Sequence, residues 1–370
     1  ATVTVDAPCG QASEAIGQVA DATEELEQLS QQLKRPLPEP AKTMLRNSLK
    51  LMSSEMYSGP PRALWELLQN ADDCIYHKEP ELLIEQTGEN LWIQYNEEGF
   101  TSENVKALCS LGSSTKGSGQ TGEKGVGFKS AFVLSSRPHV LSNPYRFFFD
   151  ESSPCPLPHV TPHLLDAGVT LPRPVPQKGT AVYLPLRKEF PNLLDEIVPE
   201  ALLFLHRLRC ITVESGHDVR RMELCHDGCR CTVRVTGSST KEHDYLIARS
   251  QDLAIAFPLT NPEGGLLMAT LPIHRLEGLK TPLNGPFELT ANREALRENS
   301  QHNVQVRDGL AELFLKAAEE HPILSSKVWQ LQPDAALGGF WAPFAQRVRT
   351  GLQEVPLIPC LSGANGVFAA

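Results

Sequence analysis

The sequence lacks several features that would assign it to a specialised class of protein. It contains no run of about eighteen apolar residues, so we expect no membrane span. It has no cluster of Lys and Arg, and its formal net charge is −10, which argues against nucleic-acid binding by this fragment. It begins without methionine or a signal-peptide pattern and ends in a strand-like stretch, so we expect a piece of a longer polypeptide.

Cysteine is infrequent and shows no disulfide pattern. The nine cysteines are an odd number and mostly lie in apolar runs, which indicates a reduced, intracellular protein, cytoplasmic or nuclear. Residues 225–231 contain three cysteines and a histidine, which could hold zinc. Their spacing differs from that of a zinc knuckle, and Asp227-Gly228 is a turn signal, so the sequence favours a β-hairpin there.

The residues that are present are typical of a globular protein. Hydrophobic residues make up 41% and charged residues 21% of the 370 positions. A chain of this length has room for two domains. Alternating apolar residues predict strands at 82–84 and 91–95 around a turn at 88–90, and the helical period predicts helices over 13–34 and 191–207.

Three polar residues in one predicted helix form the first candidate site. Glu66, Asn70 and Asp73 are spaced by four and three positions, which puts them on one face of the helix. The amide oxygen of Asn70 is a suitable ligand for a hard cation such as Mg²⁺. The carboxylate of Glu66 could polarise a water molecule aimed at a terminal phosphate, which makes Glu66 a candidate general base. This face therefore suits a complex of Mg²⁺ with a nucleotide.

A glycine-rich segment that starts at residue 122 is the second candidate. It runs into a predicted helix, and its backbone N–H groups can point outward together, as phosphate binding requires. The candidate phosphate-binding residues are Gly122, Lys124, Gly125, Val126, Gly127 and Phe128. On spacing alone, such segments are more often a solvated helix face and a simple turn. Their order and separation favour the functional interpretation.

The two segments resemble the N-box and the second glycine box of the GHKL ATPases, the superfamily of gyrase, heat-shock chaperones, histidine kinases and MutL. The sequences of residues 66–73, 111–116 and 125–130 resemble those of the sacsin and NO VEIN branch most. The resemblance implies a Bergerat fold, binding of ATP together with Mg²⁺, and Asn70 as the metal ligand. It also implies a chaperone-like action on a protein client or partner.

The resemblance implies further nucleotide-binding residues. Those that match family positions near the phosphates are Ser114, Thr115 and Lys116. They lie in residues 112–124, a segment that in the family closes over bound nucleotide as a lid. Thr180 matches a threonine that lies against the adenine. Asn96 stands where the family has an aspartate that accepts a hydrogen bond from the adenine amino group, and Gly99 and Phe100 follow it.

The predicted fold class is α+β. Residues 1–41 should form an N-terminal helix and a proline-rich linker, and residues 42–190 a Bergerat α/β sandwich that binds the nucleotide. Residues 191–370 should form an α+β domain like the transducer or middle domain of the family, here truncated. In this last domain, Lys280 and Arg293 are candidates for a basic residue that stabilises charge on the γ-phosphate.

Two functions remain open at this point. In the first, Mg²⁺-dependent ATP binding and slow hydrolysis drive lid closure and a conformational change in a chaperone-like or scaffold protein. In the alternative, the chain is a nucleotide-gated or degenerate protein-interaction module that does not hydrolyse. The missing aspartate at position 96 favours the alternative, whereas the presence of both Glu66 and Asn70 favours hydrolysis. The sequence predicts no oligomeric state.

Overall fold

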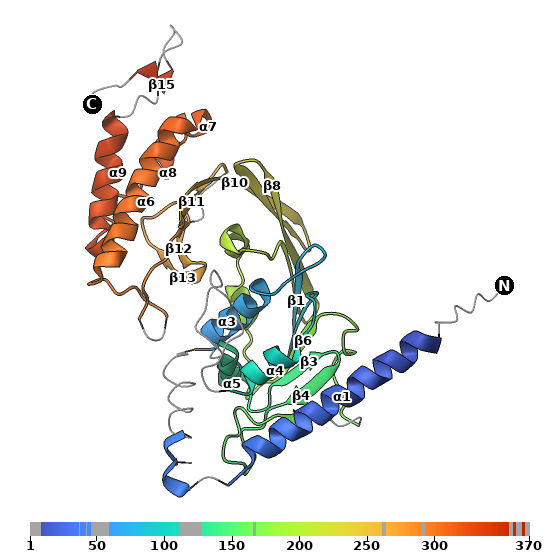
Figure 1. Cartoon of the computed structure of the whole chain (residues 1–370). Coiled ribbons are helices and arrows are strands. Elements are labelled where there is room, and N and C mark those ends of the chain that lie inside the picture. Colours follow the sequence, from blue (N-terminus) through green and yellow to red (C-terminus); the bar gives the residue numbers. More distant parts are fainter. Residues whose placement is uncertain are drawn as a thin grey trace, which may run out of the picture. The chain divides into compact units, whose positions relative to one another are not determined.

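The computed structural model describes residues 9–36, 38–41, 43–45, 59–110, 127–165, 168–260, 264–290, 293–354, 358–359 and 365–366 (Figure 1). The chain divides into two compact units. Unit 1 comprises Ala1–Glu196 with Ile211–Val219, and unit 2 comprises Ile197–Cys210 with Arg220–Ala370. The predicted boundaries after residues 41 and 190 stay a prediction. Among the helices in the described part of the chain, none is both long and apolar enough to cross a membrane.

Unit 1 combines strands with mostly short helical segments. Its strands are β1 (Glu81–Thr87), β2 (Asn90–Tyr95), β3 (His139–Ser142), β4 (Tyr145–Phe148), β5 (His163–Leu164), β6 (Thr180–Pro185), most of β7 (Cys210–Ser215) and the start of β8 (Asp218–Asp227). Its helical segments are α1 (Cys9–Leu33), α3 (Pro60–Asp72), α4 (Ser102–Leu108), η1 (Gly127–Ser130), α5 (Ala131–Leu134) and η2 (Leu193–Glu196). Strands β1 and β2 form the predicted antiparallel hairpin, with Gly88 in the turn at a φ of +55°.

Unit 2 places helices against strands. Its strands are the rest of β8, β9 (Arg230–Thr236), β10 (Thr240–Ser250), β11 (Leu253–Pro258), β12 (Gly265–Ala269), β13 (Leu271–Leu276), β14 (Leu283–Asn284), β15 (Ile358–Pro359) and β16 (Asn365–Gly366). Its helical segments are η3 (Pro199–Phe204), α6 (Gln301–Glu320), α7 (Pro322–Ser325), α8 (Val328–Leu331), η4 (Gly339–Trp341) and α9 (Ala342–Glu354). Helix α6 packs against α9 and β11, and the rings of Phe257 and Phe314 meet edge to face at 5.0 Å in this core. Strands β8 and β9 form the hairpin predicted over 225–231.

The predicted fold class is wrong. We expected an α+β chain, with a Bergerat α/β sandwich over 42–190 and a separate α+β domain after it. Instead, a 14-stranded mixed sheet dominates the described residues, in the order β13-β12-β14-β11-β10-β9-β8-β7-β1-β2-β6-β3-β4-β5, and helices are few. Alternation of apolar residues identifies strands but does not specify which edges pair, and unpaired edges readily accept another strand.

The predicted helix over 191–207 is also wrong. The structure has two short 3-10 segments there, η2 and η3, with Pro199 at the start of the second. Proline lacks the N–H group that an interior helical position must donate, and its ring clashes with the preceding turn. The apolar period of this segment is therefore satisfied by two separate turns.

A row of aromatic rings crosses five neighbouring strands of unit 1. The ring of Tyr183 on β6 lies 6.1 Å from that of Trp92 on β2 and 5.1 Å from that of His139 on β3. The ring of Phe148 on β4 lies 5.2 Å from His139 and 5.3 Å from His163 on β5. Each pair is directly opposite in the strand register. A slip of one residue would turn these rings to the other face, so the row fixes the register.

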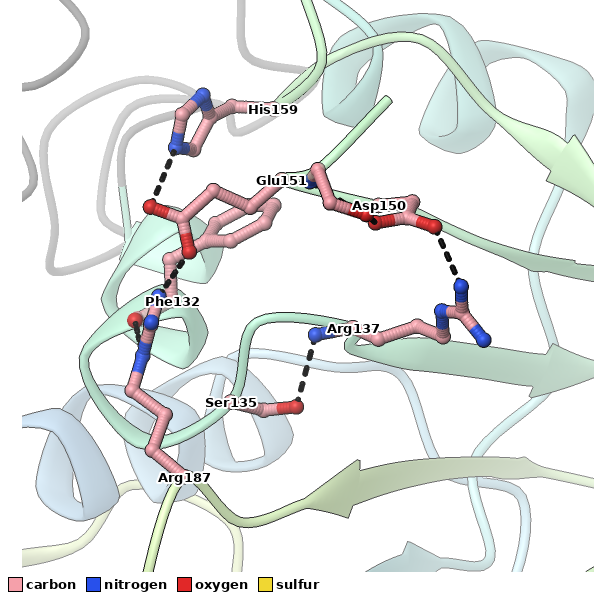
Figure 2. A network of polar contacts seen from close by, with 8 residues as sticks. Phe132, Ser135, Arg137, Asp150, Glu151, His159 and Arg187 are labelled. Carbon is pink, nitrogen blue, oxygen red and sulfur yellow. Dashed lines mark hydrogen bonds and ion pairs between the residues drawn. The ribbon is translucent and has the colours of Figure 1, made fainter. Parts of the chain in front are cut away.

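A network of polar contacts holds the residues after β4 against α5 and the end of β6 (Figure 2). Arg187 donates a hydrogen bond from Nε to the Phe132 carbonyl at 3.0 Å, and its guanidinium pairs with Glu151. The Nε2 atom of His159 lies 3.9 Å from Oε1 of Glu151. The network therefore anchors the proline-dense stretch after β4, which has little regular structure of its own.

Helix α1 lies on unit 1 through one buried face. Ala22 and Leu26 are buried on this face, whereas Val19 is 41% exposed, and the helix contacts β4 and β5. Between the two buried residues, Glu25 accepts hydrogen bonds from groups on two other elements. The Tyr145 hydroxyl donates at 2.8 Å and the Lys106 ammonium lies at 2.9 Å.

The Ser102 hydroxyl completes the set of donors around Glu25. Burial raises the pKa of Glu25, but the bonds from Ser102, Lys106 and Tyr145 outweigh it, and the pKa lies below its ordinary value. The ionised carboxylate therefore stabilises the docked position of α1.

Replacing Glu25 by Gln should loosen α1. A lowered pKa in the folded state means that the stabilisation is present above the unfolded pKa of about 4.3 and is lost as the pH falls through the folded value. At pH 7, the variant should show amide protection in α1 reduced by about tenfold, since a hydrogen bond to a charged group contributes about 1.5–3 kcal/mol. Hydrogen-exchange mass spectrometry measures this, with the exposed Glu27→Gln as control. Equal protection in Glu25→Gln and wild type would contradict the role of Glu25.

Candidate functional site

Helix α3 buries most of its polar side chains. Glu66 is 3% exposed and accepts a hydrogen bond from Nη2 of Arg62 at 2.7 Å. A buried carboxylate requires such a partner because an uncompensated charge is costly to remove from water. Arg62 is therefore part of the candidate site although the sequence analysis did not include it. Its position four residues before Glu66, one helical turn away, was the signal that could have indicated the pair.

The structure brings Asn70 against Gly127, the first described residue of the glycine-rich segment. A Cβ atom added to Gly127 would lie 3.2 Å from Oδ1 of Asn70 and 3.5 Å from its Nδ2. A residue without a side chain allows this close approach of the backbone to the amide. Helix α3 and η1 also pack against each other. The two segments predicted to form one site are thus neighbours.

Asn96 is engaged by the backbone that precedes β1. Its Oδ1 accepts a hydrogen bond from the N–H of Glu81 at 2.9 Å, and its Nδ2 donates to the carbonyl of Glu79 at 2.9 Å. Both ends of the amide therefore hold a loop in place. The neighbouring residue, Glu97, is the one whose side chain lies beside Thr180.

Glu97 is a buried acid at the end of β2, 7% exposed. The Thr180 hydroxyl donates to Oε1 of Glu97 at 2.5 Å, and a second hydroxyl, Ser142 Oγ, lies 2.6 Å from Thr180 Oγ1. Burial raises the pKa of Glu97, while the Thr180 hydroxyl and the Gly99 backbone lower it and Glu98 raises it further. An acid two positions before Gly99, in a motif expected to supply a carboxylate, was the sequence signal for this residue.

Two glycines let three elements meet at this carboxylate. Gly99 has a φ of +98° and Gly179 a φ of +85°, a region that favours glycine. A Cβ atom on Gly179 would come within 2.3 Å of the Tyr95 carbonyl oxygen, so no larger residue fits there. The Phe100 N–H donates to Ser142 Oγ at 2.8 Å. The turn after β2, the end of β3 and the start of β6 are thereby tied together.

The turn after β2 lies beside the residues that follow α3, because the Glu98 N–H donates to the Ile75 carbonyl at 3.1 Å. Burial, with Cys74 and Glu97 nearby, raises the pKa of Tyr95 well above its usual value. The Cys74 thiol in turn donates to the carbonyl of Asn70 at 3.1 Å. Asp73, which caps α3, is also buried at this end of the helix. The end of α3 and the carboxylate of Glu97 therefore belong to one neighbourhood.

Two residues of the glycine-rich motif lie in the core of unit 1. Phe128 is buried, with its ring 6.0 Å from that of Phe149. Lys129 is also buried, and its Nζ donates to the carbonyls of Leu108 and His159. Burial lowers the pKa of Lys129 to about 8. Lys129 thus joins the end of α4 to η1 rather than extending toward solvent.

The remaining predicted nucleotide-binding residues lie outside the described residues or in unit 2. Those outside the described residues are Ser114, Thr115, Lys116, Gly122, Lys124, Gly125 and Val126. The two basic candidates belong to unit 2. There Nζ of Lys280 pairs with Oδ1 of Asp334 at 2.9 Å, and Arg293 has a left-handed backbone with a φ of +57°.

Metal-binding side chains do not gather in the described part of the chain. There, no group of three or more His, Cys, Asp or Glu residues could hold a metal ion. The three cysteines of residues 225–231 form no disulfide.

Comparison with known proteins places the chain beside one plant protein. No protein-family model matches it. It is 30% identical, over an alignment of 379 residues, to Protein NO VEIN of Arabidopsis thaliana. The alignment covers 88% of this chain and 13% of that protein. The chain is therefore NO VEIN-like in sequence, which confirms the predicted resemblance to this branch, and it spans a small part of its relative.

Replacing Glu97 by Gln should change how stability depends on pH. Because the folded pKa is raised, the Glu97 carboxyl favours folding below the unfolded pKa, and this contribution is lost as the pH rises through the folded value. The free energy of unfolding of wild type, minus that of Glu97→Gln, should therefore decrease between about pH 4 and pH 8. Urea unfolding at several pH values measures it. The exposed Glu103→Gln serves as control, and a pH-independent difference for Glu97→Gln would contradict the assignment.

Proposed function

We propose that unit 1 binds a purine nucleotide, ATP in the first place, together with Mg²⁺. The observation that carries the proposal is that Asn70 lies against Gly127, and that the turn after β2, which holds the Glu97–Thr180 pair, is bonded to the residues that follow α3. The Asn70 amide beside the backbone of Gly127 is suited to bind the phosphates and the cation. The buried carboxyl of Glu97 beside the Thr180 hydroxyl is suited to form hydrogen bonds with the edge of the nucleobase. The resemblance of the motifs to those of GHKL ATPases supports the proposal, whereas the fold gives it no support.

The residues around Asn70 fit an Mg²⁺ ion that is carried by a nucleotide. Mg²⁺ is usually held by one or two protein oxygens together with phosphates and water. The Asn70 amide offers one such oxygen, and the absence of a side chain at Gly127 leaves the amide close to the backbone of η1. When bound, the ion would neutralise phosphate charge and polarise the terminal phosphate. This arrangement is compatible with the lack of a metal-binding cluster in the described residues.

Glu97 takes the role that the sequence analysis gave to Asn96. With Oε1 engaged by Thr180, the second oxygen of an ionised Glu97 is the acceptor we assign to the exocyclic amino group of adenine. A carboxylate is a stronger acceptor than an amide. Glu97 therefore supplies the carboxylate that is missing at position 96, and the missing aspartate favours a degenerate site less than the sequence indicated.

Glu66 is the proposed general base for slow hydrolysis. A buried carboxylate that can take a proton from water contributes to such a step when it is held in place, and Arg62 holds it. The same ion pair favours the alternative function, a nucleotide-gated module without hydrolysis, because the Arg62 guanidinium already engages Oε1 of Glu66. Turnover by the protein decides between the two.

The proposed output is a conformational change that acts on a protein client or partner, as in a chaperone-like or scaffold protein. This part rests on the motif resemblance alone. The acidic balance of the chain favours a protein over a nucleic acid as partner. The odd number of cysteines, mostly in apolar runs and without a disulfide pattern, supports an intracellular location, cytoplasmic or nuclear.

Replacing Asn70 by Ala should weaken Mg²⁺–ATP binding. Losing an oxygen that contacts a charged group costs about 1.5–3 kcal/mol, which corresponds to an affinity lower by about tenfold or more. Titration calorimetry with ATP, ADP and GTP, with and without Mg²⁺, measures the effect. The exposed Asn192→Ala is the matched control. Tight binding that is unchanged in Asn70→Ala would remove Asn70 from the site, and no binding to wild type would overturn the proposal.

Replacing Glu66 by Gln should separate binding from turnover. The variant should bind Mg²⁺–ATP like wild type and hydrolyse it about 10²- to 10⁴-fold more slowly, the usual loss when a general base is removed. Phosphate release at saturating ATP measures the rate. Equal rates in both proteins would exclude Glu66 as the base. No measurable hydrolysis by wild type, despite binding, would establish the non-hydrolysing alternative.

A further inference from the structure

The contact between Glu97 and Thr180 continues into a chain of buried oxygens. Thr180 Oγ1 lies 2.5 Å from Glu97 Oε1 and 2.6 Å from Ser142 Oγ. Ser142 Oγ also receives the Phe100 N–H at 2.8 Å and lies 3.5 Å from the Gly179 carbonyl oxygen. Ser142 and Thr180 are fully buried. Water therefore does not substitute for any of these partners.

Each hydroxyl has one hydrogen, which restricts how the chain can be bonded. When Glu97 is ionised, it can only accept, so the Thr180 hydrogen points to Glu97. The hydrogen of Ser142 then points to Thr180, and the Phe100 N–H points to Ser142. All donors then run toward the negative charge, and the oxygen–oxygen distances of 2.5 and 2.6 Å allow this orientation of the hydroxyl hydrogens.

When Glu97 is protonated, the chain can run the other way. The carboxyl then donates to Thr180, Thr180 donates to Ser142, and Ser142 turns to the Gly179 carbonyl across the longer contact of 3.5 Å. This arrangement replaces a charge-assisted hydrogen bond by a neutral one, which is about half as strong. Ser142 therefore favours the ionised form of Glu97, through Thr180.

We propose that Ser142 is a positioning residue that orients the Thr180 hydroxyl, keeps Glu97 an acceptor and thereby makes the site select a 6-amino purine over a 6-oxo purine. An ionised Glu97 accepts a hydrogen bond from an amino group at that position and repels a carbonyl oxygen. A protonated Glu97 does not repel a carbonyl oxygen, and it can donate its one hydrogen to that oxygen when the Thr180 hydroxyl keeps donating to Oε1. The proposal rests on the proposed nucleotide site.

The charges around Glu97 are compatible with a preference between the two nucleobases that depends on pH. Among the described residues, the titratable groups that act on Glu97 are Glu98 and Tyr95, and the hydroxyls come from β3 and β6. Burial raises the pKa of Glu97, so its titration lies closer to neutral pH than that of an exposed glutamate. The preference for ATP over ITP should therefore rise with pH.

The test compares the affinities for Mg²⁺–ATP and Mg²⁺–ITP, by calorimetry between about pH 5.5 and pH 8.5, in wild type and Ser142→Ala. In wild type, the ratio of the affinity for Mg²⁺–ATP to the affinity for Mg²⁺–ITP should rise with pH. In Ser142→Ala, the rise should occur at higher pH, and the preference for ATP at pH 7 should fall about threefold or more, because the ionised form loses a charge-directed donor chain. In Glu97→Gln, the ratio should not change with pH.

Ser135→Ala is the matched control. Ser135 is also fully buried, and its hydroxyl accepts one backbone N–H, from Arg137 at 3.0 Å (Figure 2). It lies outside the set of hydroxyls bonded to Glu97 and Thr180. A loss of packing alone would lower the stability of both serine variants and leave the pH profile unchanged. The profile of Ser135→Ala should therefore equal that of wild type. If Ser142→Ala also equals wild type, Ser142 has no positioning role.

A ligand-free measurement separates this proposal from the proposed function. The free energy of unfolding is measured at several pH values for each protein and for the same protein carrying Glu97→Gln. The difference between the two, followed against pH, reports the titration of Glu97 without nucleotide. Ser142→Ala should move this titration to higher pH, and Thr180→Val, of equal size, should move it further. Should neither nucleotide bind to wild type, the nucleotide site is wrong. Should both variants titrate like wild type, the hydroxyl chain does not control Glu97.

Discussion

The pairing of buried carboxylates organises unit 1 around its candidate site. An uncompensated buried charge costs several kcal/mol, so a glutamate can be buried only where partners are fixed beside it. Glu66 is paired within its own helix by Arg62, and Glu97 is bonded across the sheet by Thr180. At the periphery, Glu25 anchors α1 with donors from α4 and β4. These carboxylates decide where the surrounding turns and helices can lie.

Features that depend on short stretches of sequence could be predicted. The β1–β2 hairpin follows from alternation around a turn, and α3 begins with two prolines, which suit a first helical turn. The proximity of Asn70 to Gly127 followed from the order of two motifs. Strand pairing could not be predicted, because the alternation that defines a strand is the same whichever edge it joins, and one mixed sheet replaced the expected sandwich.

The adenine acceptor was assigned from the sequence to Asn96, one position before the residue that the structure favours. Asn96 was predicted because it stands where the GHKL family has an aspartate that binds adenine, but the backbone near β1 engages its amide on both sides. Glu97 lies beside Thr180 instead, and Ser142, far away in sequence, completes the contact. A hydroxyl contributed by another strand leaves no local signal, whereas the acid at position 97 did. The alignment covers 13% of the NO VEIN relative, so the proposed output rests on the motifs of this chain and not on that protein as a whole.

Hydrogen exchange with and without a non-hydrolysable Mg²⁺–ATP analogue tests most directly whether α3 and the Glu97 turn form one nucleotide site. Mass spectrometry should show increased protection in peptides that cover α3, residues 95–101 and the start of β6, with the helices α6 and α9 unchanged. That pattern would establish the site as a unit. Unchanged exchange in all three segments at saturating analogue, or protection confined to unit 2, would contradict the account.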